Sequence, residues 1–167
     1  MLDLAVVGSG GAAMAAAIAG RQRGASVVLV ERDVLGGTCV NVGCVPSKTL
    51  LAAAATRHRA LTNPFTGVPT SAYDVNLAAL VAQKDELVGR LRQAKYADIA
   101  DAHGFGIFRG AARFADHDSL VVDGRPLVAR NYVIATGAEP AVPDLPGLAG
   151  TAFLTSTTAM RLTELPT

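Results

Sequence analysis

The segment that most constrains the fold is the amino-terminal one, where a short apolar run passes directly into a glycine-rich turn. Residues 3–7 (DLAVV) suit a buried parallel strand, and the turn that follows, GSGGAA at 8–13, has the spacing G-x-G-x-x-A. Strong helix formers fill most of residues 14–19, and a second apolar run at 26–30 ends in Glu31. This order of strand, turn, helix, strand and acid predicts a parallel α/β sheet that opens with a dinucleotide-binding unit.

The small residues of this turn have separate physical roles. Gly8 permits the tight turn, Gly10 lets the backbone approach a pyrophosphate, and Ala13 is small enough for close packing of helix on strand. The amino terminus of the helix, where Ala12 lies, adds free N–H groups and a positive dipole end. Glu31 is placed to accept hydrogen bonds from ribose hydroxyls and would repel a 2′-phosphate, so the site favours FAD or NAD over NADP.

The two cysteines of the chain lie close together, in the segment GTCVNVGC at 37–44, with VPSK following at 45–48. A bridge between Cys39 and Cys44 would close a small ring, worth only about 2 kcal/mol when judged by its effect on the unfolded chain. The pair is therefore better suited to open and close as a two-electron redox couple, or to bind a metal, than to act as a structural staple. Two unrelated core cysteines, or a minor local bridge, are the alternative.

Composition limits the classes of function. With 167 residues, of which 50% are hydrophobic and 17% charged, the chain has the make-up of one globular domain. The net charge of +1 is not gathered into a basic block, so we expect no nucleic-acid partner. No apolar run approaches the roughly 20 residues that span a bilayer, and the first apolar run feeds a turn instead of a secretory cleavage site. We expect no membrane association and a cytoplasmic location, where paired cysteines are more often catalytic than structural.

Two helices are expected after the cysteines. Pro46 suits the first turn of a helix over 46–60, and the prolines and glycine of 62–72 predict a loop. Asn76 is placed to cap a longer helix that continues to about Asp101.

The remaining pattern predicts strands. A third parallel strand is expected at 106–109 and a further buried strand at 132–135. Asp123-Gly124 predicts a hairpin turn within a small antiparallel meander, whose strands are expected near 111–115, 119–123 and 127–130.

Four segments together resemble the flavin-binding half of the pyridine nucleotide–disulfide oxidoreductases: the glycine turn, GGTCVNVGCVPSK, GAARF at 110–114 and IATGAEPAVPDLPG at 134–147. The resemblance runs from the first residue to the last. Within the family, GSGGAAMAAA at 8–17 and LRQAKY at 91–96 are more similar to mercuric reductases than to lipoamide dehydrogenases or glutathione reductases. The implied fold is α/β, a Rossmann-like FAD-binding domain over residues 1–147. Residues 148–167 would lead toward an NAD(P)-binding domain that the chain lacks.

The resemblance also implies roles for individual residues. Cys39 matches the interchange thiol that faces substrate, Cys44 the charge-transfer thiol beside the flavin, and Lys48 the lysine near the flavin N5 edge. The residues that match FAD-binding positions, or that we expect to join them in the glycine turn and around the cysteines, are Gly8, Gly10, Ala12, Ala13, Glu31, Gly37, Thr38, Lys48, Ala112, Thr136 and Gly137. The histidines match no family motif and are interpreted as surface or loop residues: His58, His103 and His117.

The implied activity is that of a flavin disulfide reductase. NADPH would supply electrons to FAD, the Cys39–Cys44 disulfide would open, and its thiolates would transiently bind Hg(II), a soft cation that prefers sulfur. A lipoamide or glutathione type would reduce a disulfide substrate instead.

The family pattern includes a second glycine fingerprint, a segment that completes the FAD domain, and a carboxy-terminal dimerisation domain. None of these is found here. We therefore expect the chain to be the amino-terminal fragment of a homodimeric enzyme and to be inactive alone. A non-catalytic truncated remnant is the alternative.

Overall fold

The structure, a computed structural model, describes residues 1–117 and 119–166. Its base is a four-stranded sheet in the order β3-β2-β1-β7, in which every pairing is parallel. The strands are β1 (Leu2–Val7), β2 (Val27–Glu31), β3 (Gly106–Arg109) and β7 (Ala129–Ile134). The α/β fold and the parallel strand predicted at 106–109 are therefore confirmed.

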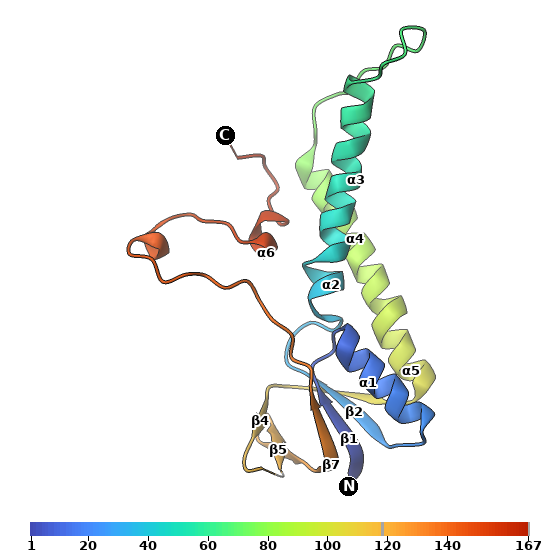
Figure 1. Ribbon diagram of the computed structural model, residues 1–167, viewed down its shortest axis with the longest axis vertical. Helices are drawn as coiled ribbons and strands as arrows, with labels where there is room; N and C mark the ends of the chain where they lie inside the picture. The colour runs from blue at the N-terminus through green and yellow to red at the C-terminus, as the bar shows by residue number, and fades with distance from the viewer. Residues whose placement is uncertain (118, 167) are drawn as a thin grey trace.

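Alternate residues of the strands pack into two separate cores, as the period of a strand requires. Val6 of β1 lies in the core beneath α1 (Gly11–Gln22), together with the fully buried Ala13 and Ala17. Its neighbour Ala5 points the other way, into a core formed with Leu120 and other residues of the small sheet. The parallel sheet is thus covered by helices on one face and by the small sheet on the other (Figure 1).

The small sheet is an antiparallel meander of β4 (Ala112–Phe114), β5 (Leu120–Val122) and β6 (Arg125–Leu127). Asp123 and Gly124 have φ values of 46° and 80°, as a two-residue hairpin turn requires, so the predicted turn is confirmed. The third strand predicted at 127–130 is wrong. The tight turn pairs Arg125 directly with Val122, and the chain from Ala129 onward leaves the meander to pair with β1.

The strand predicted at 132–135 exists as β7, but its expected burial is wrong. β7 begins earlier, at Ala129, and pairs with β1 alone. Ile134 is 67% exposed, because an edge strand has no neighbour on its outer side. The apolar composition of this run predicted its strand conformation but not its position at the sheet edge.

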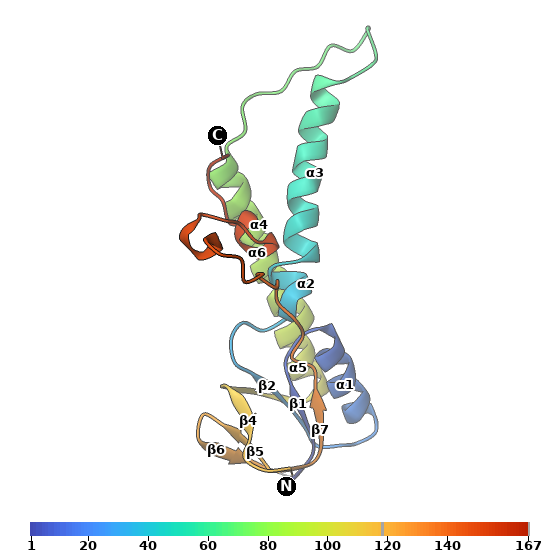
Figure 2. The same ribbon diagram turned by 60° about the vertical axis from the view of Figure 1, so that its left-hand side comes forward.

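A long helical hairpin projects from one end of the sheet (Figures 1 and 2). The short α2 (Gly37–Asn41) leads into α3 (Cys44–Leu61), with Pro46 in its first turn as predicted. The chain returns through α4 (Leu77–Arg92), whose cap residue Asn76 accepts a hydrogen bond from the Ala79 N–H at 3.0 Å. The helix predicted to continue to about Asp101 is interrupted by a π-helical turn, η1 (Gln93–Ala97), before α5 (Asp98–His103).

The segment after β7 leaves the carboxyl end of the sheet and approaches the hairpin near α6 (Figures 1 and 2). Its described part carries η2 (Leu148–Gly150) and α6 (Ser156–Ala159). Lys84 of α4, only 3% exposed, anchors it by donating a hydrogen bond to the Met160 carbonyl at 3.1 Å. The same ammonium lies 2.6 Å from the exposed Asp85 carboxylate. In the described part of the chain, no helix is both long enough and apolar enough to cross a bilayer.

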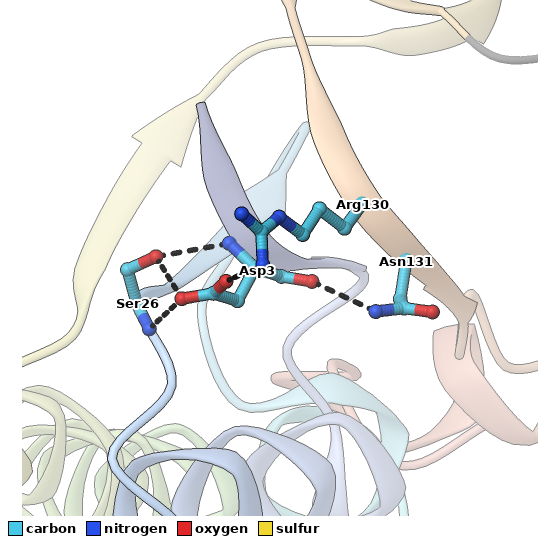
Figure 3. Close-up of polar contacts among 4 residues, drawn as sticks. All are labelled: Asp3, Ser26, Arg130 and Asn131. Carbon is cyan, nitrogen blue, oxygen red and sulfur yellow. Dashed lines mark hydrogen bonds and ion pairs between the residues drawn. The ribbon is translucent and has the colours of Figure 1, made fainter.

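A polar cluster joins three strands at their amino-terminal ends (Figure 3). The Asp3 carboxylate accepts hydrogen bonds from the N–H and the hydroxyl of Ser26, at 2.9 and 2.7 Å. Arg130 lies 3.6 Å from the other carboxylate oxygen, and Asn131 donates to the Asp3 carbonyl at 3.1 Å. The Ser26 hydrogen bonds are the main reason that the pKa of Asp3 is lowered.

Candidate functional site: a nucleotide cavity beside a thiol pair

A cavity of about 680 Å³ lies at the carboxyl ends of the parallel strands. The turn after β1, the end of β2, the start of α2 and the segment after β7 meet there, at the base of the helical hairpin (Figure 1). Open parallel sheets bind their ligands in this crevice. The predicted site residues that line it are Gly8, Gly10, Ala12, Glu31, Gly37, Thr38, Cys39, Ala112, Thr136 and Gly137. Ala13, Cys44 and Lys48 are not among its lining residues.

The glycine turn forms the floor of the cavity. Gly8 has φ of +112°, and a β-carbon there would lie 2.2 Å from the Ala135 carbonyl oxygen, so no other residue fits. At Gly10 a β-carbon would meet only the Gly37 α-carbon, at 3.7 Å, an ordinary contact distance. Gly8 is therefore required by the fold itself. Gly10 is not, which leaves close approach of a ligand as the physical reason for a glycine there.

The amino terminus of α1 faces the same cavity through Gly11 and Ala12. The cap residue Gly10 has no side chain to accept a hydrogen bond from the first-turn N–H groups. An uncapped helix amino terminus presents these donors and the positive end of its dipole to an anion. Ala13 lies one position farther on and is fully buried against the sheet, so its role is the close helix–strand packing that its size predicted.

Glu31, the last residue of β2, lines the cavity beside the glycine turn. Its carboxylate accepts a hydrogen bond from the Ser9 hydroxyl on one oxygen and from the Asp33 N–H, at 2.9 Å, on the other. Ser9 is only 1% exposed and itself accepts a hydrogen bond from the Gly36 N–H at 3.0 Å. The sequence assigned no role to Ser9, because it occupies a variable position of the G-x-G-x-x-A pattern.

The two cysteines lie in consecutive helices, and their side chains interact. Cys39 lies in α2 and Cys44 begins α3, and both are exposed free thiols. Gly43 permits this close return, since a β-carbon there would lie 2.9 Å from the Thr38 carbonyl oxygen. Cys39 lines the cavity, whereas Cys44 lies outside its lining.

The pKa of Cys39 depends mainly on its contact with Cys44. The pKa of Cys39 is raised, first because its side chain is hydrogen bonded to that of Cys44, and then by burial and by the Cys44 charge. The Cys44 backbone N–H and the positive charge of Lys48 act in the opposite direction. The structure thus brings together the three residues that the resemblance grouped, with the cation of Lys48 in electrostatic range of Cys39. Such a dithiol can form a disulfide or bind a soft metal ion through both sulfurs.

Tyr96 is a residue of this site to which the sequence assigned no role. It lies in the π-helical turn η1, and its ring would be 3.4 Å from a β-carbon placed on Gly36. The pKa of Tyr96 is raised by burial and then by the negative charges of the Cys39 and Cys44 thiolates, so its hydroxyl lies within electrostatic range of the pair. Single π-helical turns are frequent at functional sites, but no sequence pattern predicted this one.

Neighbouring contacts hold the cysteine helix in place. Asn41 donates to the carbonyls of Leu35 and Gly37, at 3.0 and 2.9 Å, and accepts from the Arg92 side chain at 2.9 Å. The Thr38 hydroxyl donates to the Ala138 carbonyl at 3.4 Å, which draws the segment after β7 over the cavity. Among the residues the structure describes, no three metal-binding side chains gather together, so a metal site here would rest on the thiol pair.

Comparison with known proteins identifies the family. The profile of the pyridine nucleotide-disulphide oxidoreductases matches residues 2–167. The chain belongs to this family. It is similar to mercuric reductases from Staphylococcus aureus, at 49% identity over 164 residues, and from Streptomyces lividans, at 51% over 170 residues. Each alignment covers 98% of this chain but only 30% and 36% of those proteins, so the chain spans about a third of their length.

Solved structures agree with this assignment. The HOCl-induced flavoprotein disulfide reductase RclA from Escherichia coli superposes with a TM-score of 0.81 at 29% sequence identity, covering 98% of this chain and 35% of that one. The family predicted from the glycine turn and the cysteine segment is therefore confirmed, as is the similarity to mercuric reductases.

Proposed function

We propose that this chain is the amino-terminal, FAD-binding part of an NADPH-dependent mercuric reductase. In this proposal residues 1–147 form the FAD-binding domain, and 148–167 lead toward the NADPH-binding part of a longer protein. The observation that carries the proposal is that Cys39, one of two thiols in contact, lines the same cavity as the glycine turn and Glu31. This supports a proposed nucleotide site and a proposed redox thiol pair as parts of one site.

The residues present fit FAD. The uncapped amino terminus of α1 and the bare backbone at Gly10 suit a pyrophosphate, and the Glu31 carboxylate suits the hydroxyls of an unphosphorylated ribose. The other positions proposed to contact it are Gly8, Ala12, Gly37, Thr38, Lys48, Ala112, Thr136 and Gly137. A cavity of about 680 Å³ is within the usual range for a cofactor site. When bound, FAD would supply the two-electron transfer between nicotinamide and the thiol pair.

The two thiols would have different roles in the reaction. From the resemblance we assign Cys39 to the substrate side and Cys44 to the flavin side. This assignment rests on the resemblance alone, because it is Cys39 that lines the proposed FAD cavity. When Hg(II) replaces the protons of both thiols, two S–H bonds are lost, two Hg–S bonds form and two protons are released. The pKa of Cys39 is raised, mainly by its hydrogen bond to Cys44; the positive charge of Lys48 opposes this rise, so it would favour the release. Electrons from NADPH would then convert the bound ion to elemental mercury.

The whole protein is proposed to be a cytoplasmic homodimer whose substrate is a small molecule or metal ion, with Hg(II) favoured. This rests on the similarity to the mercuric reductases, because the chain covers about a third of their length. A second candidate is the reduction of a disulfide substrate by the same thiol pair, as in a lipoamide or glutathione type. The likeness to a flavoprotein disulfide reductase favours it.

One set of assays separates these candidates. The full-length protein should be yellow and should oxidise NADPH in the presence of Hg(II), but not with oxidised glutathione or lipoamide. Cys39→Ser and Cys44→Ser should each abolish this turnover, whereas Ser119→Ala, on the distant meander, should not. A colourless protein that cannot be reconstituted with FAD would refute the cofactor assignment, and turnover with a disulfide but not with Hg(II) would favour the second candidate. The isolated 167-residue chain should show no turnover; mercury-dependent turnover by it would show that it needs no further domain.

A further inference from the structure

The buried hydroxyl of Ser9, in the glycine turn, is hydrogen bonded both to the Glu31 carboxylate and to the segment that precedes the cysteine helix. Among the described residues, no other side chain makes both of these contacts. Ser9 occupies a variable position of the glycine pattern, between Gly8, which the fold requires, and Gly10, where a β-carbon would make only an ordinary contact. Its partners come from the end of β2 and from Gly36, which directly precedes α2. We propose that Ser9 is a positioning residue that orients Glu31 to select an unphosphorylated ribose.

The direction of the Ser9 hydrogen bonds is fixed. A hydroxyl has one proton and two acceptor lone pairs. The Gly36 N–H can only donate, so the Ser9 oxygen accepts from it, and the single hydroxyl proton is directed to Glu31. At 1% exposure, Ser9 has no water-facing alternative for that proton. The Ser9 hydroxyl therefore donates its proton to the Glu31 carboxylate and to no other group.

The occupied lone pairs of Glu31 determine what it can still bind. An ionised carboxylate only accepts hydrogen bonds and has about four lone-pair positions. Ser9 takes one on one oxygen, and the Asp33 N–H takes one on the other. About two positions are left, and Glu31 lines the cavity, so it can accept from two further donors. The 2′- and 3′-hydroxyls of a ribose supply two such donors, whereas a 2′-phosphate supplies none and adds like charge.

Removal of the Ser9 hydroxyl would affect both partners. The carboxylate would lose the donor that holds one of its oxygens, and the buried Gly36 N–H would lose its acceptor. Glu31 could then rotate, and its preference for a ribose with both hydroxyls should fall. Because this selectivity concerns the adenosine end of the cofactor, the proposal rests on the proposed FAD site.

The test compares FAD with an analogue whose adenosine lacks the 2′-hydroxyl. Dissociation constants for both are measured in the full-length protein by flavin fluorescence. Since a hydrogen bond to a charged group is worth about tenfold or more in affinity, the wild type should bind FAD about tenfold or more tightly than the analogue. Ser9→Ala should weaken FAD binding and reduce this ratio to about twofold or less.

Two further variants test the same discrimination between FAD and the analogue. Glu31→Gln retains the size of the side chain but not its acceptor pattern, so it should lose the same discrimination even if Ser9→Ala folds poorly. Ser26→Ala is the matched control, because it removes a serine–carboxylate hydrogen bond at the opposite end of the sheet (Figure 3). It should leave the ratio unchanged. Ser9→Ala or Glu31→Gln with wild-type discrimination, or a wild type that does not discriminate, would overturn the positioning role. Failure to bind FAD at all would instead refute the proposed function.

Discussion

Replacement of Gly8 by alanine should destabilise the fold through a clash that no side-chain movement can relieve. A β-carbon on Gly8 would lie 2.2 Å from the Ala135 carbonyl oxygen, 2.8 Å from its carbon and 3.2 Å from the Thr136 nitrogen. All three atoms belong to the backbone of the segment that continues β7. The φ of +112° adds strain for any residue with a side chain.

The expected cost follows from these two effects. A residue held in a sparsely populated backbone region costs about 1–3 kcal/mol. Forcing packed atoms apart costs about another 1–3 kcal/mol. Alanine also restricts the unfolded chain, which offsets about 0.4–1 kcal/mol. The net loss of about 1–5.5 kcal/mol is a large part of the roughly 5–15 kcal/mol that stabilises an ordinary domain.

Urea unfolding of the flavin-free protein, followed by circular dichroism, measures this loss directly. Gly89→Ala is the matched control, because Gly89 lies within α4 and a β-carbon there has no neighbour within 4 Å. That variant should be neutral or more stable by about 0.5–1 kcal/mol. If Gly8→Ala unfolds within about 0.5 kcal/mol of the wild type, the size of an ordinary surface substitution, the close contact between the glycine turn and β7 is refuted.

Four other predictions follow from the site and its surroundings. Gly10→Ala should change the free energy of unfolding by less than about 1 kcal/mol but weaken FAD binding, so equal stability with unchanged affinity would contradict its role. Cys44→Ala in the reduced protein should lower the pKa of Cys39, because it removes the hydrogen-bonding neighbour that mainly raises it. Iodoacetamide should then alkylate Cys39 faster at neutral pH, and an unchanged pH–rate profile would argue against the contact. The lowered pKa of Asp3 contributes stability that is present above the ordinary carboxyl value of 3.8 and is lost as the pH falls through the folded-state pKa. Asp3→Asn should therefore be less stable than wild type at neutral pH, with the difference narrowing in acid, as urea unfolding at several pH values would show. Lys84→Met should release the segment that carries α6, seen as faster hydrogen exchange at 155–160 with α4 unaffected; equal protection would mean that other contacts hold the segment.

Features set by local chemistry could be predicted from the sequence. The unit from β1 to Glu31 follows from apolar runs, small residues and helix formers that are adjacent in the chain. The Asp123-Gly124 hairpin and the Asn76 cap depend on the conformational and hydrogen-bonding preferences of one or two residues. The spacing of Cys39 and Cys44 brought their thiols into contact, since few residues separate them.

Other features were decided only by tertiary structure, because they depend on contacts between distant parts of the chain. The composition of β7 gives no sign that it is an edge strand, and its boundary with β6 depends on where pairing with β1 begins. Ser9 gained its role from two segments, at Glu31 and Gly36, that come near it only when β1 and β2 pair. Tyr96 lies within electrostatic range of the cysteines because the chain returns to the base of the hairpin through α4 and η1, far along the sequence from α2. The sequence shows which residue types can make such contacts. Which residues then pair depends on the free energy of the whole folded chain, which no local pattern contains.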